Sequence, residues 1–102
     1  MIRHILLVKF KSTVTPSNIE TVRELFESMP VKIEGVDAVE WGLNDSPEGL
    51  DQGFTHSVLM TFTNDQARQH YLPHPEHEAL KAVFVQLVEN IVVFDYPVTS
   101  VK

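Results

Sequence analysis

The opening segment, residues 2–11, constrains the fold more than any other feature of this chain. Its residues alternate as in a β-strand, and one face carries five side chains: Ile2, His4, Leu6, Val8 and Phe10. The opposite face is also apolar at its centre, because Ile5 and Leu7 lie between the charged residues Arg3 and Lys9. A strand with apolar groups on both sides is typical of a sheet that is covered on both faces. Both faces of the sheet that contains this strand therefore need a layer of structure packed against them.

Helical patterns follow in two parts of the chain. Thr15 and Pro16 have the residue types of an N-cap and a first helical position, and apolar residues at helical spacing continue to Pro30, which is expected to end the helix. A short helix begins after Thr63 or Asn64, with Thr63 and Gln66 forming a candidate capping box. A last apolar stripe at helical spacing contains five residues: Leu80, Val83, Phe84, Leu87 and Val88.

Three further segments, 36–43, 54–62 and 91–96, have strand patterns, and residues 44–53 have the composition of a long loop. The resulting order β-α-β-β-α-α-β predicts an α+β fold, the ferredoxin-like split βαβ arrangement with a four-stranded antiparallel sheet. Residues 1–102 are enough for one domain. Helices on a single face would leave the other face of the sheet uncovered.

A second copy of the chain is the simplest cover for that face, because monomers rarely expose apolar patches of several hundred Å². We therefore expect a homodimer related by a two-fold axis, with paired sheets forming a dimeric α+β barrel. Four residues are candidates for the interface: Ile5, Leu7, Val39 and Trp41. For Trp41 the interface is favoured over a ligand site, since tryptophan is enriched at interfaces.

Composition excludes several classes of function. The net charge is −6 and the eight Lys and Arg residues are mostly scattered singly, which argues against a nucleic-acid partner. The apolar runs are too short to cross a membrane, and Met1 leads directly into a strand pattern instead of a signal segment. The absence of cysteine removes disulfide and thiolate chemistry and is compatible with a cytoplasmic location.

Proton-transfer chemistry is concentrated in residues 71–77, where Tyr71 and His77 flank Pro73 and Pro75. Tyrosine and histidine move protons near neutral pH, and the two prolines break any helix that passes through the segment. In a sheet ordered 4-1-3-2, the start of the first strand lies beside the end of the last. This puts Asp95 near His4, at the end of the sheet where the third strand leads into the helix with Tyr71. We expect Tyr71 as hydrogen-bond donor, His77 as general base and Asp95 as the acceptor that orients His77. In the alternative interpretation these residues only cap a helix, close a cavity and end a strand.

An apolar cavity between sheet and helices is the expected substrate site. Beside Tyr71 and His77, its lining is expected to contain seven residues: His4, Leu6, Val8, Phe26, Val58, Leu80 and Phe84. His70, His74 and His77 have the spacing of one helix face, but the prolines interrupt that helix, so no metal site is predicted. No motif for a cofactor is present.

Several motifs together resemble the stress-responsive α/β-barrel (Dabb) family. They span nearly the whole chain and comprise residues 4–11, 42–46, 53–56, 71–77 and 94–96. The resemblance implies a dimeric α+β barrel. It also implies a likeness to polyketide-cyclising members of the family, which use a tyrosine and a histidine at the positions of Tyr71 and His77. Other members are plant stress proteins, so the resemblance alone does not assign an activity.

Two functions remain open from the sequence. The first is a cofactor-independent cyclase, isomerase or lyase that acts on a carbonyl compound, with Tyr71 and His77 as acid and base. The alternative is a non-enzymatic stress-response or structural oligomeric protein. An enzyme needs an open cavity of roughly 300 Å³ or more that Tyr71 and His77 face, whereas a structural protein can fill this space.

Overall fold

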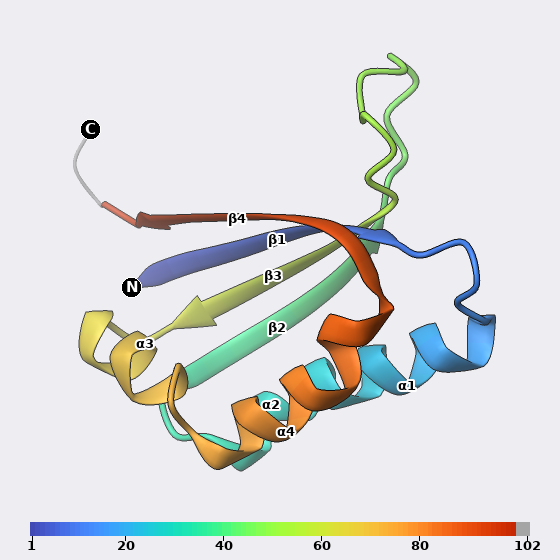
Figure 1. The fold of residues 1–102 in the computed structure, drawn as a ribbon. Coiled ribbons are helices and arrows are strands. Elements are labelled where there is room, and N and C mark those ends of the chain that lie inside the picture. Colours follow the sequence, from blue (N-terminus) through green and yellow to red (C-terminus); the bar gives the residue numbers. More distant parts are fainter. Residues whose placement is uncertain (100–102) are drawn as a thin grey trace.

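The computed structural model describes residues 1–99 and has the expected α+β, ferredoxin-like order of elements (Figure 1). The elements are β1 (Ile2–Phe10), α1 (Pro16–Glu27), α2 (Met29–Lys32), β2 (Val36–Leu43), β3 (His56–Phe62), α3 (Asp65–Tyr71), α4 (Pro75–Phe84), the 3-10 turn η1 (Val85–Leu87) and β4 (Val88–Pro97).

The helix boundaries follow the expectations from the sequence, with two differences. Thr15 caps α1 in a capping box with Asn18, and Asn64 caps α3 by accepting from the backbone N–H of Ala67. The box expected between Thr63 and Gln66 does not form, because Asn64 itself occupies the cap. Pro30 does not end the helical region either. It lies in the first turn of α2, where proline is tolerated because its missing N–H has no intrahelical partner there.

The four strands form one antiparallel sheet in the order β2-β3-β1-β4. This is the order expected from the sequence. Leu6 lies opposite Val58 on β3 and Val93 on β4, while His4 lies opposite Met60 and Asp95. The helices all lie on one side of the sheet, below it in Figure 1. The two faces of the sheet therefore have different surroundings, and we call them the covered face and the open face.

The hydrophobic core lies between the covered face and the helices. Val22 and Phe26 of α1 and Leu80 and Phe84 of α4 are buried there. Phe26 and Phe84 meet edge to face, with ring centroids 5.1 Å apart. The sheet contributes residues that alternate along β1 and β3, among which Val8, Val58, Met60 and Phe62 are fully buried.

The open face carries apolar side chains at its centre and has no cover within residues 1–99. Ile5 pairs with Phe94 and Leu7 with Val92, and Phe94 is 61 % exposed. The expectation for β2 is wrong in this respect. Val39 and Trp41 lie opposite Met60 and Val58, whose side chains are buried on the covered face, and they pack against the core. Since the side chains of paired residues point to the same side, β2 places Val39 and Trp41 on the covered face, where Trp41 meets Phe26 of α1.

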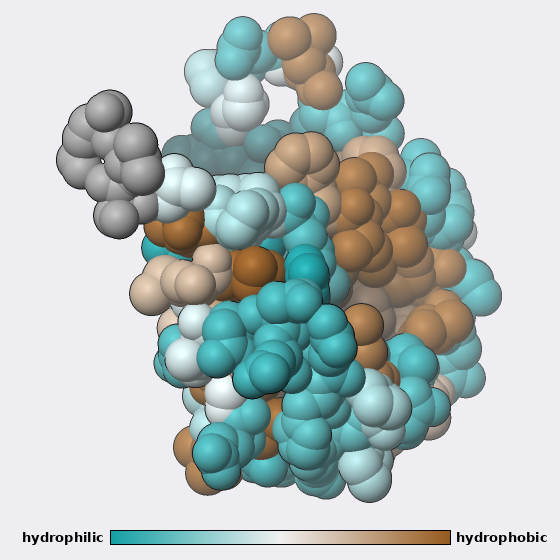
Figure 2. Space-filling view, turned by 90° about the vertical axis from the view of Figure 1, so that its left-hand side faces the viewer, coloured by the Kyte–Doolittle hydropathy of each residue, from teal (hydrophilic) through white to brown (hydrophobic). Residues whose placement is uncertain are grey.

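A second apolar area lies where β4 and α4 border each other. β4 is an edge strand, so Ile91 and Val93 are exposed although they belong to the covered face. Val85 and Leu72 are exposed nearby. Figure 2 shows hydrophobic surface gathered on its right-hand side, the side of the molecule that faces the viewer in Figure 1. Within residues 1–99, no helix has both the length and the apolar character that a membrane span requires.

Candidate functional site

The segment 71–77, which we call the proline corner, places the side chains of Tyr71 and His77 in the lining of the same cavity. α3 ends after Tyr71, the backbone N–H of His74 donates to the carbonyl of Tyr71, and Pro75 begins α4. His74 is the N-cap of α4, since its Nδ1 accepts from the backbone N–H of Glu76 at 3.0 Å. The corner thus fixes the start of α4 relative to the end of α3. As a result, the rings of Tyr71 and His77 stack with their centroids 4.2 Å apart.

A cavity of about 250 Å³ opens between β1, β4, α1 and α4. Its lining consists of His4, Leu6, Phe26, Tyr71, Leu72, His77, Leu80, Lys81, Phe84, Val85, Ile91 and Val93. The expected residues Val8 and Val58 are not in this lining. Both are completely buried in the packed core: Val58 lies on β3, one strand further from the edge strand β4, and Val8 lies further along β1 than Leu6. The cavity is instead bounded by Ile91 and Val93 of the edge strand, which places its mouth beside the apolar area of β4 and α4.

Tyr71 supplies a hydrogen-bond donor inside this cavity. Its side chain is only 1 % exposed and packs against the ring of Phe62. The hydroxyl has no hydrogen-bond partner within residues 1–99, and it is not sealed away, because no polar side-chain atom there is both buried and unpaired. Burial raises the pKa of Tyr71 well above its ordinary value. The hydroxyl therefore stays protonated and is free to donate to a molecule in the cavity.

His77 supplies a base beside that donor. Because a carbonyl oxygen only accepts, Nδ1–H of His77 donates to the carbonyl of Leu72 at 2.9 Å, and the neutral ring presents Nε2 as a free acceptor. Burial lowers the pKa of His77, and the positive charge of Lys81 acts in the same direction. The bond to Leu72 and the charge of Glu78 oppose this shift. His77 is therefore a neutral base at pH 7.

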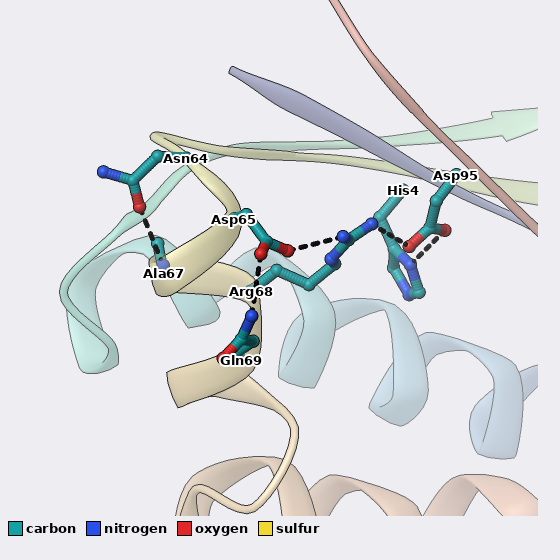
Figure 3. Close-up of polar contacts among 7 residues, drawn as sticks. All are labelled: His4, Asn64, Asp65, Ala67, Arg68, Gln69 and Asp95. Carbon is teal, nitrogen blue, oxygen red and sulfur yellow. Dashed lines mark hydrogen bonds and ion pairs between the residues drawn. The ribbon is translucent and has the colours of Figure 1, made fainter.

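His4 is held by the aspartate that we expected to orient His77. Nδ1–H of His4 donates to Oδ1 of Asp95 at 2.7 Å, and the other carboxylate oxygen accepts from Arg68 at 3.1 Å (Figure 3). The expected bond between His77 and Asp95 does not form. In the antiparallel pair of β1 and β4, His4 and Asp95 are directly opposite, so His4 takes the carboxylate, and the nearby carbonyl of Leu72 takes His77.

Arg68 is the residue that sequence reasoning missed. Its guanidinium bridges Asp65 on its own helix and Asp95 on β4, at 2.5 Å and 3.1 Å. The spacing from Asp65 to Arg68 is that of a helical ion pair and was available from the sequence. The spacing from Arg68 to Tyr71 is the same, which puts the two side chains on adjoining parts of α3. The hydrogen bond from Arg68 to Asp95 could not be predicted in this way, because it depends on how closely α3 approaches β4.

The remaining histidines lie outside the cavity. His56 is opposite Val8 at the far end of β1, as the antiparallel register predicts, and its ring packs between Phe10 and Trp41. His70 and His74 meet edge to face at the corner, with ring centroids 5.5 Å apart. In the part of the chain that the structure describes, no three histidine, aspartate or glutamate side chains converge to hold a metal ion.

The arrangement combines one protonated phenol with two imidazoles that each have a free Nε2. All three groups line the same end of an otherwise apolar cavity, to which the charged residue Lys81 is added. A donor and a base at one apolar site can remove a proton from a carbon acid and stabilise the oxyanion that forms. The groups need no cofactor for this chemistry.

Known proteins with a similar sequence cover nearly all of this chain. The stress-response A/B barrel domain-containing protein HS1 of Arabidopsis thaliana is 35 % identical over 101 residues, which are 99 % of this chain and 93 % of that protein. Olivetolic acid cyclase of Cannabis sativa is 27 % identical over 95 residues, covering 93 % of this chain and 94 % of the cyclase.

Solved structures agree with the fold. The crystal structure of At3g17210 from Arabidopsis thaliana has a TM-score of 0.93 at 34 % identity and covers 100 % of this chain and 99 % of its own. A protein of unknown function from Thermobifida fusca, described as dimeric and ferredoxin-like, has a TM-score of 0.81 at 23 % identity, with 95 % of this chain and 90 % of its own chain covered.

The family assignment follows from a match that extends over almost every element described above. Residues 2–98, from the first residue of β1 to just beyond the last residue of β4, match the Stress responsive A/B Barrel Domain, or Dabb. The chain is a member of the Dabb family.

Proposed function

We propose that this protein binds a compact, largely apolar carbonyl compound between its sheet and helices and moves a proton on it without a cofactor. The observation that carries the proposal is the hydroxyl of Tyr71, which is unpaired in an apolar cavity and lies beside the neutral base His77. The hydroxyl is reachable from the cavity and has no protein partner within residues 1–99, so it is available to donate to a ligand whose oxygen accepts from it.

The reaction class is enolisation followed by bond formation or cleavage. Nε2 of His77 takes a proton from the carbon next to a carbonyl group, and the electron pair of that C–H bond moves onto the carbonyl oxygen. The hydroxyl of Tyr71 donates a hydrogen bond to the resulting enolate. The enolate carbon then attacks a second carbonyl, as in a cyclase, or takes the proton back at another position, as in an isomerase. Protonated His77 returns the proton at the end.

The cavity restricts the size of the ligand. Its volume of about 250 Å³ is slightly below the roughly 300 Å³ at which ordinary ligand pockets begin. The exposed residues Ile91, Val93 and Val85 border it, so a longer apolar tail has a surface to lie on outside the cavity. Likeness to olivetolic acid cyclase supports bond formation by ring closure as the reaction, since that relative is named for ring closure.

The small cavity volume is also the observation that favours the alternative, a stress-response or structural protein without catalysis. In that case the same space is a packing defect at the edge of the sheet, and Tyr71 and His77 act by filling it. The two functions differ in one measurable property, which is whether a specific ligand binds through Tyr71 and His77.

A homodimer through the open face belongs to the same proposal. Ile5, Leu7 and Phe94 form an apolar centre that residues 1–99 leave uncovered. A hollow of about 440 Å³ between this face and the loop 44–55 is bordered by Leu7 and Val92 and offers room for side chains of a partner. The Thermobifida fusca protein, which has the same fold, is described as dimeric. The cavity lies on the covered face, so the dimer leaves it accessible.

The test uses benzoylacetate as a binding probe and acetophenone as a probe of proton removal. Ligand-detected NMR measures binding of benzoylacetate, and deuterium uptake by the methyl group of acetophenone in D₂O measures enolisation. We expect binding and uptake with the parent protein and the loss of both in His77→Ala. The matched control is His70→Ala, which removes an exposed histidine seven residues earlier, outside the cavity.

Equal uptake in the parent and in His77→Ala contradicts the catalytic part of the proposal. Absence of binding across a wider set of small aromatic and β-keto acids, with His77→Ala merely less stable, favours the structural alternative.

A further inference from the structure

Arg68 connects the two walls of the cavity that carry its polar groups. It belongs to α3, the helix that ends in Tyr71, and it contacts Asp95 on β4, the partner of His4. Within residues 1–99, the bond from Arg68 to Asp95 is the side-chain hydrogen bond that joins α3 to β4. Figure 3 shows the continuous chain of contacts from Asp65 through Arg68 and Asp95 to the ring of His4.

The carboxylate of Asp95 is held at both of its oxygens. Oδ2 accepts from Arg68, and Oδ1 accepts from His4. With Oδ2 fixed, the carboxylate cannot rotate, so Oδ1 stays in place for Nδ1–H of His4. This bond selects the tautomer of neutral His4 that has a free Nε2. The ring of His4 lines the cavity, and Figure 3 shows it extending from the sheet toward the helices.

The helix that carries Arg68 needs an attachment of this kind. α3 has seven residues, and a helix of this length is unstable without tertiary contacts. The ion pair between Arg68 and Asp95 is partly buried, at 28 % and 24 % side-chain exposure, so solvent screens it less than a surface pair. Arg68 is therefore placed to fix α3, and with it Tyr71, at a set distance from His4.

We propose that Arg68 is a positioning residue of the cavity, which acts through Asp95 to hold His4 as a second base in the lining that also contains Tyr71. This inference rests on the proposed function, because the relative placement of His4 and Tyr71 matters only for a ligand that contacts both. Arg68 itself does not line the cavity. It acts by keeping the carboxylate in place and α3 attached to β4.

The first test follows the imidazole N–H proton of His4 by ¹H–¹⁵N NMR in the protein without ligand. A carboxylate-bound Nδ1–H exchanges slowly with water and gives a separate downfield signal, assigned by its loss in His4→Gln. We expect Arg68→Gln to lose or broaden this signal, because the carboxylate is no longer fixed. Arg23→Gln is the matched control, since Arg23 pairs with Glu27 on the exposed side of α1.

The second test measures deuterium uptake by acetophenone in the same variants. We expect Arg68→Gln to lower kcat by about tenfold, the size of effect that loss of a hydrogen bond between charged groups produces, with a smaller change in KM. Arg68→Lys keeps the charge but lacks the rigid planar fork whose two terminal nitrogens reach Asp95 and Asp65 separately, so it is expected to restore only part of the rate and of the His4 signal. Arg23→Gln is expected to behave as the parent.

A His4 signal and an uptake rate that are unchanged in Arg68→Gln overturn the inference, even if the protein is an enzyme. If Arg68→Gln fails to fold, Arg68→Lys decides instead: a full His4 signal in that variant shows that charge alone suffices and contradicts the bridging role. If the parent protein neither binds nor exchanges acetophenone, the proposed function fails. The His4 signal then still shows whether Arg68 holds the ring.

Discussion

The two faces of the sheet have similar apolar side chains but opposite surroundings. On the covered face, Val58, Met60 and Phe62 are completely buried beneath the helices. On the open face, Leu7, Val92 and Phe94 are 38–61 % exposed, although they lie on the same or neighbouring strands. The chain therefore completes one hydrophobic layer by itself and leaves the second uncovered within residues 1–99.

The candidate ligand site and the proposed dimer interface also lie on different faces of the sheet. Every polar group of the candidate site lies on the covered side, and the proposed interface lies on the open side. A change on one face can thus affect ligand binding without affecting assembly, or the reverse. The exposed apolar residues therefore differ by face: Phe94 belongs to the proposed partner surface, whereas Ile91 and Val93 border the cavity.

The largest effect is expected from truncating matched phenylalanines on the two faces. Phe62→Ala removes a fully buried ring that packs against Tyr71 and is expected to lower the free energy of unfolding by about 3–5 kcal/mol. Phe94→Ala removes a ring that the protomer leaves mostly exposed and is expected to change the stability of the separate protomer by less than about 1 kcal/mol. Urea denaturation at low protein concentration measures both, and equal losses contradict the difference between the faces.

A charge at the centre of the open face is expected to separate the proposed dimer. Phe94→Asp would bury an unpaired carboxylate at the interface and raise the dimer dissociation constant by roughly a thousandfold. Sedimentation velocity across a concentration series measures the change. The matched control is Val31→Asp, on the surface of α2, where the side chain is 92 % exposed. A variant Phe94→Asp that stays as dimeric as the control shows that the copies meet elsewhere.

The sequence predicted the fold well, because the fold depends on patterns that repeat along the chain. Alternation identified the strands, and the strand order β2-β3-β1-β4 then put His4 beside Asp95, which the 2.7 Å bond confirms. The error at Val39 and Trp41 has the same origin. Alternation shows that two residues share a face, but only pairing with Met60 and Val58 shows which face it is.

The site was less predictable, because hydrogen-bond partners depend on distances between elements. Tyr71, His77, His4 and Asp95 were all identified from residue type and order, yet their pairing was not. The carbonyl of Leu72 is a backbone group, and no pattern of side chains could show that it takes Nδ1–H of His77. Arg68 was missed because its contact with Asp95 joins residues 27 apart, on a helix and an edge strand.

A smaller effect, confined to the covered side, is expected from removing the hydroxyl of Tyr71. Tyr71→Phe breaks no hydrogen bond within residues 1–99 and keeps the ring packed against Phe62, so the thermal midpoint is expected to stay about the same. Deuterium uptake by acetophenone is expected to fall roughly a hundredfold, the usual cost of removing one oxyanion donor. The dimer dissociation constant should not change. A variant that loses stability and keeps its uptake rate identifies Tyr71 as a packing residue.

The smallest expected effect is a change in how stability depends on pH, at the end of the covered face opposite the site. Burial lowers the pKa of His56 below its ordinary value of about 6.5, so the unfolded chain binds a proton at a higher pH than the folded protein does. Stability is therefore complete above about pH 6.5 and is lost as the pH falls through the lowered pKa of the folded state.

His56→Gln removes this contribution and is expected to flatten the fall in thermal midpoint between about pH 7.5 and about pH 5.5. The control is His70→Gln, which replaces an exposed histidine. The slope is the quantity to compare, since loss of the ring between Phe10 and Trp41 also lowers the midpoint at every pH. Burial also lowers the pKa of His77, so part of the pH dependence of the thermal midpoint remains in His56→Gln. If His56→Gln keeps the full slope, the acid sensitivity of the covered face originates at the cavity, and His77→Gln becomes the variant that must flatten it.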